Sequence, residues 1–284
     1  MRNKLMSRFK IILSLTILLV VSNSYCQTVK VLTYNIKYDN VNDTVNNWND
    51  RKGDMVRLLK FYSPDIIGMQ EVLERQLVYL DESLSQYKAI GVGREDGKKK
   101  GEYSPILFNA DNLKLLKDNT FWLSETPDKV SIGWDAALER ICTYGLFEEV
   151  GSKKRFWVFN THFDHKGVLA REKSAELIAL KIKEINKDNL PVVLMGDLNR
   201  TPETKPIQFL KKELTDGQTA TKKAFYGPTG TFSGFDHNKI LDERIDYIFV
   251  QNFEVNSYQH IDDRMENNKH ISDHLPVMAH LTID

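Results

Sequence analysis

The chain reads Ile271-Ser272-Asp273-His274-Leu275-Pro276-Val277 near its end and Gly196-Asp197-Leu198-Asn199 further upstream. Each stretch places a carboxylate beside a second polar group at the end of an apolar run, a histidine in one case and an asparagine in the other. A polar group in a buried strand is costly unless it is paired or functional. These strand ends therefore predict a sheet that presents an acid, a base and a metal ligand at one rim.

Strand and helix patterns alternate over the rest of the chain. Apolar residues that alternate or are β-branched predict strands at residues 29–36, 65–71, 104–109, 156–162, 191–195, 244–250 and 276–283. Apolar residues at helical spacing predict helices at residues 51–62, 73–84 and 171–186. Mixed strands and helices in one long domain predict an α/β fold in which sheets pack together and helices lie outside. Periodicity does not specify the strand order.

The first 26 residues have the pattern of a secretory signal. A basic start precedes the apolar run at residues 11–21, which is too short to span a bilayer comfortably. We therefore expect a signal peptide at residues 1–26, one catalytic domain at residues 27–284 and an exported protein, periplasmic or secreted. Two alternatives stay open: Cys26 as the lipidated first residue of a lipoprotein, which Tyr25 before it disfavours, and an uncleaved membrane anchor.

Charge and cysteine content limit the partners of this chain. It carries 39 basic and 39 acidic residues, and four of the basic ones leave with the signal, so the mature chain has a formal charge of −4. A chain of that balance has no broad electrostatic attraction for DNA or RNA. Only Cys142 remains after cleavage, which excludes an intramolecular disulfide. Nothing in the sequence indicates an obligate protein partner, and we expect a monomer.

Ten polar residues lie in or just after β-rich apolar runs. They are Asn35, Glu71, Asn160, His162, Asp164, Asp197, Asn199, Asp246, Asp273 and His274. Five carboxylates with two histidines and no cysteine form an oxygen-rich set, which suits Mg²⁺ or Mn²⁺ and fits Zn²⁺ poorly. Such hard cations usually serve phosphate chemistry, where the metal neutralises developing negative charge. A histidine beside an aspartate adds a general acid or base.

Nine of these residues, all except Asp164, belong to six short motifs that occur in a fixed order. They are Thr33-Tyr34-Asn35-Ile36, Gln70-Glu71-Val72, Asn160-Thr161-His162, Gly196-Asp197-Leu198-Asn199, Ile245-Asp246-Tyr247-Ile248 and Ser272-Asp273-His274. The ordered set resembles that of the endonuclease/exonuclease/phosphatase superfamily, the DNase-I-like metal-dependent phosphoesterases. The resemblance covers residues 29–283. It implies a four-layer α/β sandwich, with two packed mixed sheets flanked by helices and the active site at one edge of the sheets.

The resemblance also implies roles for the polar residues. Glu71 would be the principal Mg²⁺ ligand, supported by Asn35, and Asp273 would be a second metal or orienting group. His162 and Asn199 would hold the scissile phosphate. Asp197 would orient or deprotonate the attacking water.

His274, held by Asp246, would contact the phosphate and assist proton transfer. Whether Asp197 or His274 is the general base stays open. Arg140 could add a phosphate clamp, because the donors of a guanidinium match phosphate oxygens in pairs. Substrate contacts are also expected from Tyr144, Asn160 and Asp164.

Each residue also has a purely structural interpretation. Asn35 could cap a strand end, Glu71 could favour the first turn of a helix, and Asp197 with Asn199 could form an Asx turn. His274 could be a buried histidine with satisfied hydrogen bonds. All of these interpretations would have to hold together while reproducing the order of the motifs. Five other histidines lack such support and are expected to be surface or structural: His165, His237, His260, His270 and His280.

The substrate is less constrained than the reaction. The charge of the mature chain and its exported character favour a phosphodiester or phosphomonoester of modest size, such as a nucleotide, a sugar phosphate or a lipid headgroup. A local patch at Lys98-Lys99-Lys100 could serve a small anionic substrate. A secreted nuclease is the second candidate. A binding protein that keeps the fold without the chemistry, and a glycosidase that uses paired carboxylates, are alternatives of other classes.

Overall fold

The computed structural model describes residues 28–283. The expected signal peptide and the alternative lipidation at Cys26 therefore lie outside the described residues. None of the helices in residues 28–283 is both long and apolar enough to cross a bilayer.

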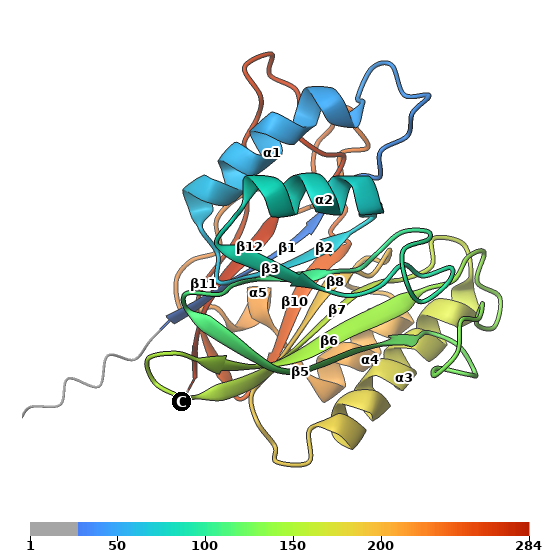
Figure 1. Ribbon diagram of the computed structural model, residues 1–284, viewed down its shortest axis with the longest axis vertical. Helices are drawn as coiled ribbons and strands as arrows, with labels where there is room; N and C mark the ends of the chain where they lie inside the picture. Colours follow the sequence, from blue (N-terminus) through green and yellow to red (C-terminus); the bar gives the residue numbers. More distant parts are fainter. Residues whose placement is uncertain (1–27, 284) are drawn as a thin grey trace, which may run out of the picture.

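Within this range the chain forms two six-stranded sheets (Figure 1). The first has the strand order β11-β12-β1-β2-β4-β3 and the second β5-β6-β7-β8-β10-β9. The strands are β1 (Thr28–Asn35), β2 (Ile66–Gln70), β3 (Tyr87–Ile90), β4 (Ile106–Asn109), β5 (Leu113–Trp122), β6 (Ile141–Glu149), β7 (Arg155–His162), β8 (Val192–Asp197), β9 (Thr215–Asp216), β10 (Asp246–Gln251), β11 (Phe253–His260) and β12 (Val277–Ile283). Both sheets are mixed, because β1 and β2, and likewise β7 and β8, pair in parallel while their other pairs are antiparallel.

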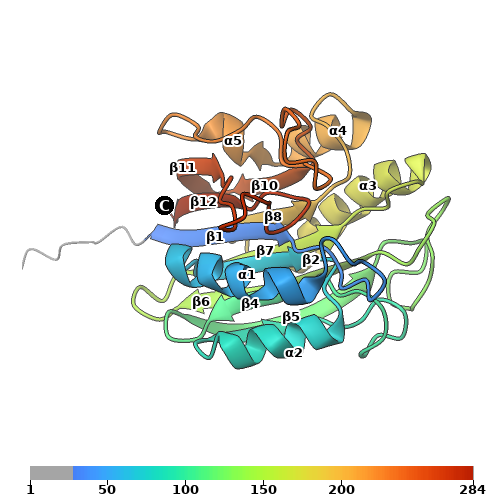
Figure 2. The ribbon, with the colours of Figure 1, turned by 90° about the horizontal axis from the view of Figure 1, so that it is seen from above.

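Helices cover the outer faces of the two sheets (Figures 1 and 2). They are α1 (Trp48–Tyr62), α2 (Glu74–Ser83), α3 (Val168–Ile185) and α4 (Lys205–Glu213), whereas the short α5 (Gly217–Ala220) contacts β10 of one sheet and β11 of the other. Apolar residues of α1 and α2 pack on the first sheet, and those of α3 and α4 pack on the second. A third apolar cluster fills the space between the sheets. The four-layer α/β sandwich predicted from the sequence is confirmed.

Six strand ends meet at one edge of this sandwich. β1, β2, β7 and β8 end there, whereas β10 and β12, which run antiparallel to their neighbours, begin there. The register places Asp246 opposite Asp197 and His162 opposite Asp197. Residues far apart in the sequence are thus brought to one edge by strand direction alone.

Gly196 allows the closest approach at this edge. Its φ is 146°, and a Cβ atom added there would lie 1.9 Å from the carbonyl oxygen of Thr161 in β7. Any other residue would therefore push β7 and β8 apart. This explains the glycine before Asp197 and its effect on the spacing of His162 and Asp197.

α1 and α3 begin three residues earlier than the apolar pattern predicts, because their starts are fixed by polar contacts, whereas α2 begins one residue later. α1 starts after Asn47, whose side chain accepts a hydrogen bond from the backbone of Asp50. α3 starts three residues before the predicted position of Arg171. The Asp135 carboxylate, from a distant loop, accepts hydrogen bonds from the first turn of α3 at 3.2 and 2.6 Å. A cap supplied from 35 residues away leaves no local sequence signal.

Several short or solvent-facing elements were not predicted, namely β3, β5, β6, β9, β11, α4 and α5. β5 illustrates the reason. Its middle residues are exposed, and its sequence carries the charged residues Lys114, Lys117 and Asp118 rather than an apolar alternation. A strand held mainly by backbone pairing with β6 has no need of a strong apolar pattern.

Candidate active site

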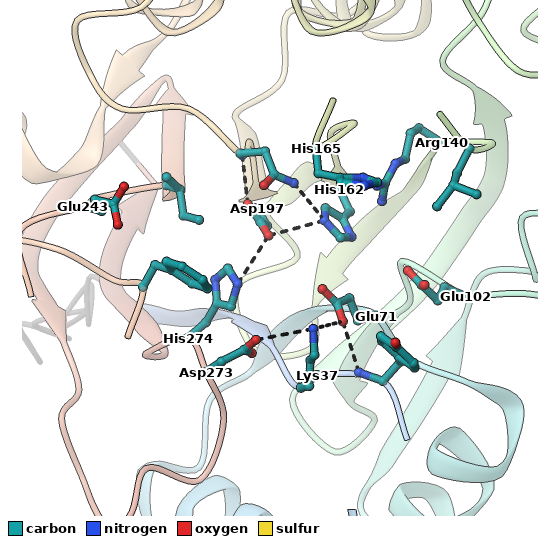
Figure 3. A pocket seen from close by; sticks show the side chains of 15 residues that line it. Lys37, Glu71, Glu102, Arg140, His162, His165, Asp197, Glu243, Asp273 and His274 are labelled. Atoms are coloured by element: carbon teal, nitrogen blue, oxygen red, sulfur yellow. Dashed lines mark hydrogen bonds and ion pairs between the residues drawn. The ribbon is translucent and has the colours of Figure 1, made fainter. Parts of the chain in front are cut away.

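A cavity of about 540 Å³ opens at the edge where the strand ends meet (Figure 3). Its walls come from both sheets and from the loops after their strands. The lining residues are Lys37, Tyr38, Glu71, Glu102, Leu138, Arg140, His162, His165, Asp197, Asn199, Phe232, Glu243, Ile245, Asp273 and His274. Six of the residues with predicted catalytic or metal roles thus line one cavity, and Asn35 and Asp246 contact these residues from behind.

Three of the lining residues have a left-handed backbone. Lys37, Glu71 and Asn199 have φ values of 57°, 59° and 52°. Each follows a strand end, after β1, β2 and β8. Non-glycine residues in this region carry strain, which persists only where the surroundings enforce it and which is frequent at functional sites. Here the conformation turns each side chain from the strand direction into the cavity.

Asn35 ties two carboxylates together beneath the cavity floor. Its amide nitrogen donates to Glu71 Oε1 at 3.2 Å and to Asp197 Oδ2 at 3.0 Å. Its oxygen accepts from the backbone N–H of Lys37 at 3.1 Å. In this arrangement Asn35 positions Glu71 and Asp197. The metal ligation predicted for Asn35 stays a prediction.

Asp246, His274 and Asp197 form a line of alternating charge. His274 Nδ1 lies 2.9 Å from Asp246 Oδ2, and its Nε2 faces Asp197 Oδ2 at 3.7 Å. Thr231 donates its hydroxyl to Asp246 Oδ2 at 2.6 Å and so fixes the far end of the line. All three titratable side chains are buried.

The surroundings raise the pKa values of both His274 and Asp197, against the effect of burial for His274 and because of burial for Asp197. Burial alone would lower the pKa of His274, but the Asp246 and Asp197 carboxylates raise it to about 10. Burial raises the pKa of Asp197 to about 7, although the His274 cation opposes the rise. At neutral pH His274 is therefore an imidazolium, a hydrogen-bond donor rather than a base. Asp197 is the group that titrates near neutrality.

The second histidine of the cavity is neutral. Burial and the nearby Arg140 and Arg94 cations lower the pKa of His162 well below its usual range. Its Nε2 lies 3.0 Å from the Asn199 amide nitrogen and 3.4 Å from Asp197 Oδ2. His162 and Asn199 thus hold the side of Asp197 that His274 leaves open, and both residues line the cavity. The His162 ring points toward Asp197 (Figure 3).

Two groups of residues could hold a cation. Atoms of Asp197, Asp246 and His274 lie within 4.8 Å of one another, but a protonated His274 cannot be a ligand. The carboxylates of Glu71 and Asp273 offer only oxygen, the donor type that Mg²⁺ and Mn²⁺ prefer. They already flank a positive charge, because Lys37 Nζ lies 3.4 Å from Glu71 Oε2 and 3.4 Å from Asp273 Oδ2. The carboxylates on the Glu71 side of the cavity are therefore the candidate ligands for a divalent cation.

Arg140 lies at the opposite end of the cavity, and its guanidinium is already engaged. Its Nε lies 3.3 Å from Asp164 Oδ2, and one Nη lies 3.0 Å from His165 Nδ1. Asp164 also accepts from the backbone of Lys166 and Gly167, at 2.9 and 2.7 Å, which folds the loop back so that His165 reaches Arg140. His165, which was expected to be a surface or structural residue, is exposed and also lines the cavity.

Three of the residues with predicted substrate contacts are not among the lining residues. Tyr144 stacks on Phe159 at 5.4 Å between ring centroids, on the side of the sheet that α3 covers. Asn160 is fully buried between the sheets, where its amide donates to the carbonyls of Met69 and Pro105. Asp164 reaches the cavity only through Arg140. For Tyr144 and Asn160 the packing corrects the prediction.

Several lining residues carry no sequence signal that distinguishes them from surface residues. Lys37, Glu102 and Glu243 lie in loops, and only their place in space makes them part of the cavity. Glu102 pairs with Arg94 through two hydrogen bonds of 2.8 and 3.1 Å. Buried Arg51 is a further unpredicted residue. It donates to the carbonyls of Ile36 and Ile271 and so ties together the two loops that carry Lys37 and Asp273.

The basic run at Lys98-Lys99-Lys100 does not form a free cationic patch. Lys99 pairs with Glu74, and Lys100 pairs with Glu95 at 3.3 Å. All three lysines are also absent from the lining of the cavity. The expectation that this run serves the substrate has no support in the structure.

Comparisons with known proteins agree with this geometry. The model of the Endonuclease/Exonuclease/phosphatase family matches residues 32–274. The structure of an endonuclease/exonuclease/phosphatase from Bacteroides vulgatus is 39% identical, covers 91% of this chain and 100% of that chain, and superposes with a TM-score of 0.86. The mannosyl-6-phosphatase of Bacteroides thetaiotaomicron is 36% identical over 90% of this chain and 100% of that chain, also with a TM-score of 0.86.

A more distant relative has a different described activity. The probable RNA exonuclease NGL3 of Saccharomyces cerevisiae is 28% identical over 206 residues, which are 65% of this chain and 40% of that protein. The similar proteins therefore include both a sugar phosphatase and a nuclease.

Proposed function

Since the chain belongs to the Endonuclease/Exonuclease/phosphatase family, we propose that it is an exported Mg²⁺-dependent phosphatase that hydrolyses the phosphomonoester of a sugar-sized substrate. The observation that carries this proposal is the placement of Asp197, whose Oδ2 faces His274 on one side and His162 on the other, at the wall of a cavity that also holds Glu71 and Asp273. The arrangement combines a base, a charged donor and a cation site within one small space.

Asp197 is the general base of the proposed reaction. A base works best when its pKa lies near the operating pH, and burial raises the pKa of Asp197 to about 7. Asn35 and the backbone of Asn199 hold the Asp197 carboxylate at 3.0 and 2.8 Å, so that it is oriented toward an attacking water. We therefore assign the base to Asp197 rather than to His274, whose protonated form the neighbouring carboxylates favour.

The remaining residues stabilise the phosphoryl group. His274 donates from Nε2 as a fixed cation toward the charge that develops on phosphate oxygens. Asn199 donates its two amide hydrogens to His162 Nε2 and to the Phe163 carbonyl and so orients His162. Asp246 keeps the His274 ring oriented and charged. A bound Mg²⁺, held by Glu71 with Asp273, would supply further neutralisation of that charge. Tyr38 donates its backbone N–H to Glu71 at 3.2 Å and keeps this carboxylate directed at the site.

The acidic residues at the two ends of the cavity are both paired with cations. Glu102 lies at one end and pairs with Arg94, and Glu243 lies at the other and pairs with Lys239 (Figure 3). The ends of the cavity therefore do not decide between a small substrate and a strand. The likeness to the mannosyl-6-phosphatase supports a sugar as the group that carries the phosphate.

A secreted nuclease is the second candidate. The likeness to the probable RNA exonuclease favours it, since the same residues at the centre of the cavity would also serve a phosphodiester. The acidic net charge of the mature chain argues against it.

The test is hydrolysis of matched substrates by the purified protein. Release of inorganic phosphate from hexose 6-phosphates is compared with cleavage of bis-p-nitrophenyl phosphate, single-stranded RNA and single-stranded DNA, each with Mg²⁺ and with EDTA. We expect kcat/KM for at least one sugar monoester to exceed that for every diester by about 10²-fold or more. Faster cleavage of RNA or DNA would replace the phosphatase by the nuclease. Turnover that persists in EDTA would reject the metal dependence.

A further inference from the structure

Lys37 is the one cation that the described structure places between carboxylates of the proposed metal site. It follows β1 by two residues, and its strained backbone is held by three contacts. Its N–H donates to Asn35, and its carbonyl accepts from Gln76 at 3.1 Å and from Arg51 at 3.3 Å. A side chain held this firmly at its base has little freedom to leave the cavity.

The Lys37 ammonium bridges two carboxylates from different strands. It lies 3.4 Å from Glu71 Oε2, after β2, and 3.4 Å from Asp273 Oδ2, before β12 (Figure 3). The two carboxylate side chains are only 12% and 8% exposed, so their charges are poorly screened by water. Both distances exceed those of tight charge-assisted hydrogen bonds, which are about 2.7–2.9 Å. Lys37 therefore acts on both carboxylates as a shared counterion rather than as the partner of one.

The charge of the site depends on this ammonium. Burial alone would lower the pKa of Lys37, but Glu71 and Asp273 raise it, so the side chain stays charged. Without Lys37, Glu71 and Asp273 would face the cavity with two negative charges and only the more distant His274 as a cation. Two uncompensated carboxylates would favour binding of more than one divalent ion. The same two carboxylates with an ammonium between them have a smaller net negative charge, which favours binding of a single ion.

We propose that Lys37 is a tethered cation of the active site, which neutralises Glu71 and Asp273 in the metal-free protein and limits the site to a single divalent ion. This role rests on the proposed metal dependence. It affects the stability of the metal-free protein and the number of divalent ions bound per chain, as well as the rate of hydrolysis. A fixed ammonium at this position also keeps a positive charge beside the phosphate whether or not the divalent ion is bound.

The test measures metal binding and thermal stability rather than turnover. Wild type is compared with Lys37→Met, which keeps the length of the side chain and removes its charge. Lys99→Met is the control, because Lys99 is a surface lysine paired with Glu74 and lies outside the cavity. Binding of Mg²⁺ and Mn²⁺ is followed by isothermal titration calorimetry, and Tm is recorded with EDTA and with Mg²⁺.

We expect wild type to bind one ion per chain, and Lys37→Met to bind the first ion about tenfold or more tightly, because a neighbouring like charge is gone. In EDTA the Tm of Lys37→Met should fall by about 2–4 °C below wild type, and Mg²⁺ should restore it. Lys99→Met should match wild type in both measurements.

Equal affinity and equal metal-free Tm in wild type and Lys37→Met would overturn the tethered cation and leave the proposed function standing. Two ions bound to wild type with comparable affinity would also overturn it. Absence of binding by all three proteins would overturn both the tethered cation and the metal dependence of the proposed function. Tighter binding by Lys37→Arg, which keeps the charge, would count against the electrostatic explanation.

Discussion

The line from Asp246 through His274 to Asp197 allows a prediction that can be worked out quantitatively. In Asp246→Asn the carboxylate 2.9 Å from His274 Nδ1 becomes a neutral amide of nearly the same shape. Asp246 is the largest of the charges that raise the pKa of His274 to about 10. One opposite charge at this distance typically accounts for about 1–3 pH units. The pKa of His274 should therefore fall by about 2 units.

Two consequences should appear in the pH–rate profile. In wild type the rate should rise as Asp197 loses its proton near pH 7 and should fall only when His274 loses its proton near pH 10. In Asp246→Asn the alkaline limb should move down by about 2 pH units, and kcat at its maximum should drop by about 10²-fold, the scale of a lost acid or base function.

The assay is release of inorganic phosphate from the best monoester at saturating Mg²⁺ between pH 5 and 11. Asp262→Asn is the matched control, because Asp262 pairs with His270 at 3.1 Å in a second aspartate–histidine pair outside the cavity. It should leave both limbs of the profile in place. An alkaline limb that stays near pH 10 in Asp246→Asn would refute the reasoning, since it would show that Asp246 does not hold the charge of His274.

Other predictions separate structural from catalytic residues. Asn160→Ala should lower the free energy of unfolding by about 2–4 kcal/mol, because it leaves the carbonyls of Met69 and Pro105 unpaired in the core. The kcat of this variant should stay within about twofold of wild type. A lower kcat with unchanged urea unfolding would contradict the structural role. Tyr144→Phe should leave KM within about twofold, and a large rise in KM would return Tyr144 to the substrate site. His260, whose pKa burial lowers to about 4, should cost stability as pH falls from about 6.5 to 4, because the unfolded chain then binds the extra proton. The slope of unfolding free energy against pH should become smaller in His260→Gln by at most about 1.4 kcal/mol per pH unit, while buried His162 keeps its own contribution. An unchanged slope would exclude His260 as a source.

The sequence predicted the centre of the site because strand direction determines it. Asn35, Glu71, His162 and Asp197 each end an apolar run, and parallel strands bring such ends to one edge. Asp246 and His274 reach the same edge because β10 and β12 run the other way and begin there. The ordered motifs were thus enough to predict both the sandwich and the group at its rim.

Some residues were misplaced or missed because a conformation, and not a sequence pattern, places them. Arg140 lines the cavity, but it precedes the first residue of β6, so the alternation within the strand does not carry over to Tyr144, which packs on Phe159 instead. His165 reaches the cavity only because Asp164 folds its loop back through two backbone hydrogen bonds. Lys37 reaches the cavity because of a left-handed turn, and a lysine in the sequence does not indicate such a turn.

The most direct test of the central claim is the rate of Asp197→Asn at saturating Mg²⁺, measured as phosphate release from the best monoester beside wild type with Mg²⁺ and wild type with EDTA. We expect EDTA to abolish wild-type turnover and Mg²⁺ to restore it. Asp197→Asn should be about 10²-fold slower or more at every Mg²⁺ concentration, with a Tm no lower than that of wild type because a buried carboxylate is removed. A rate for Asp197→Asn close to that of wild type would contradict the claim that Asp197 directs the attack of water.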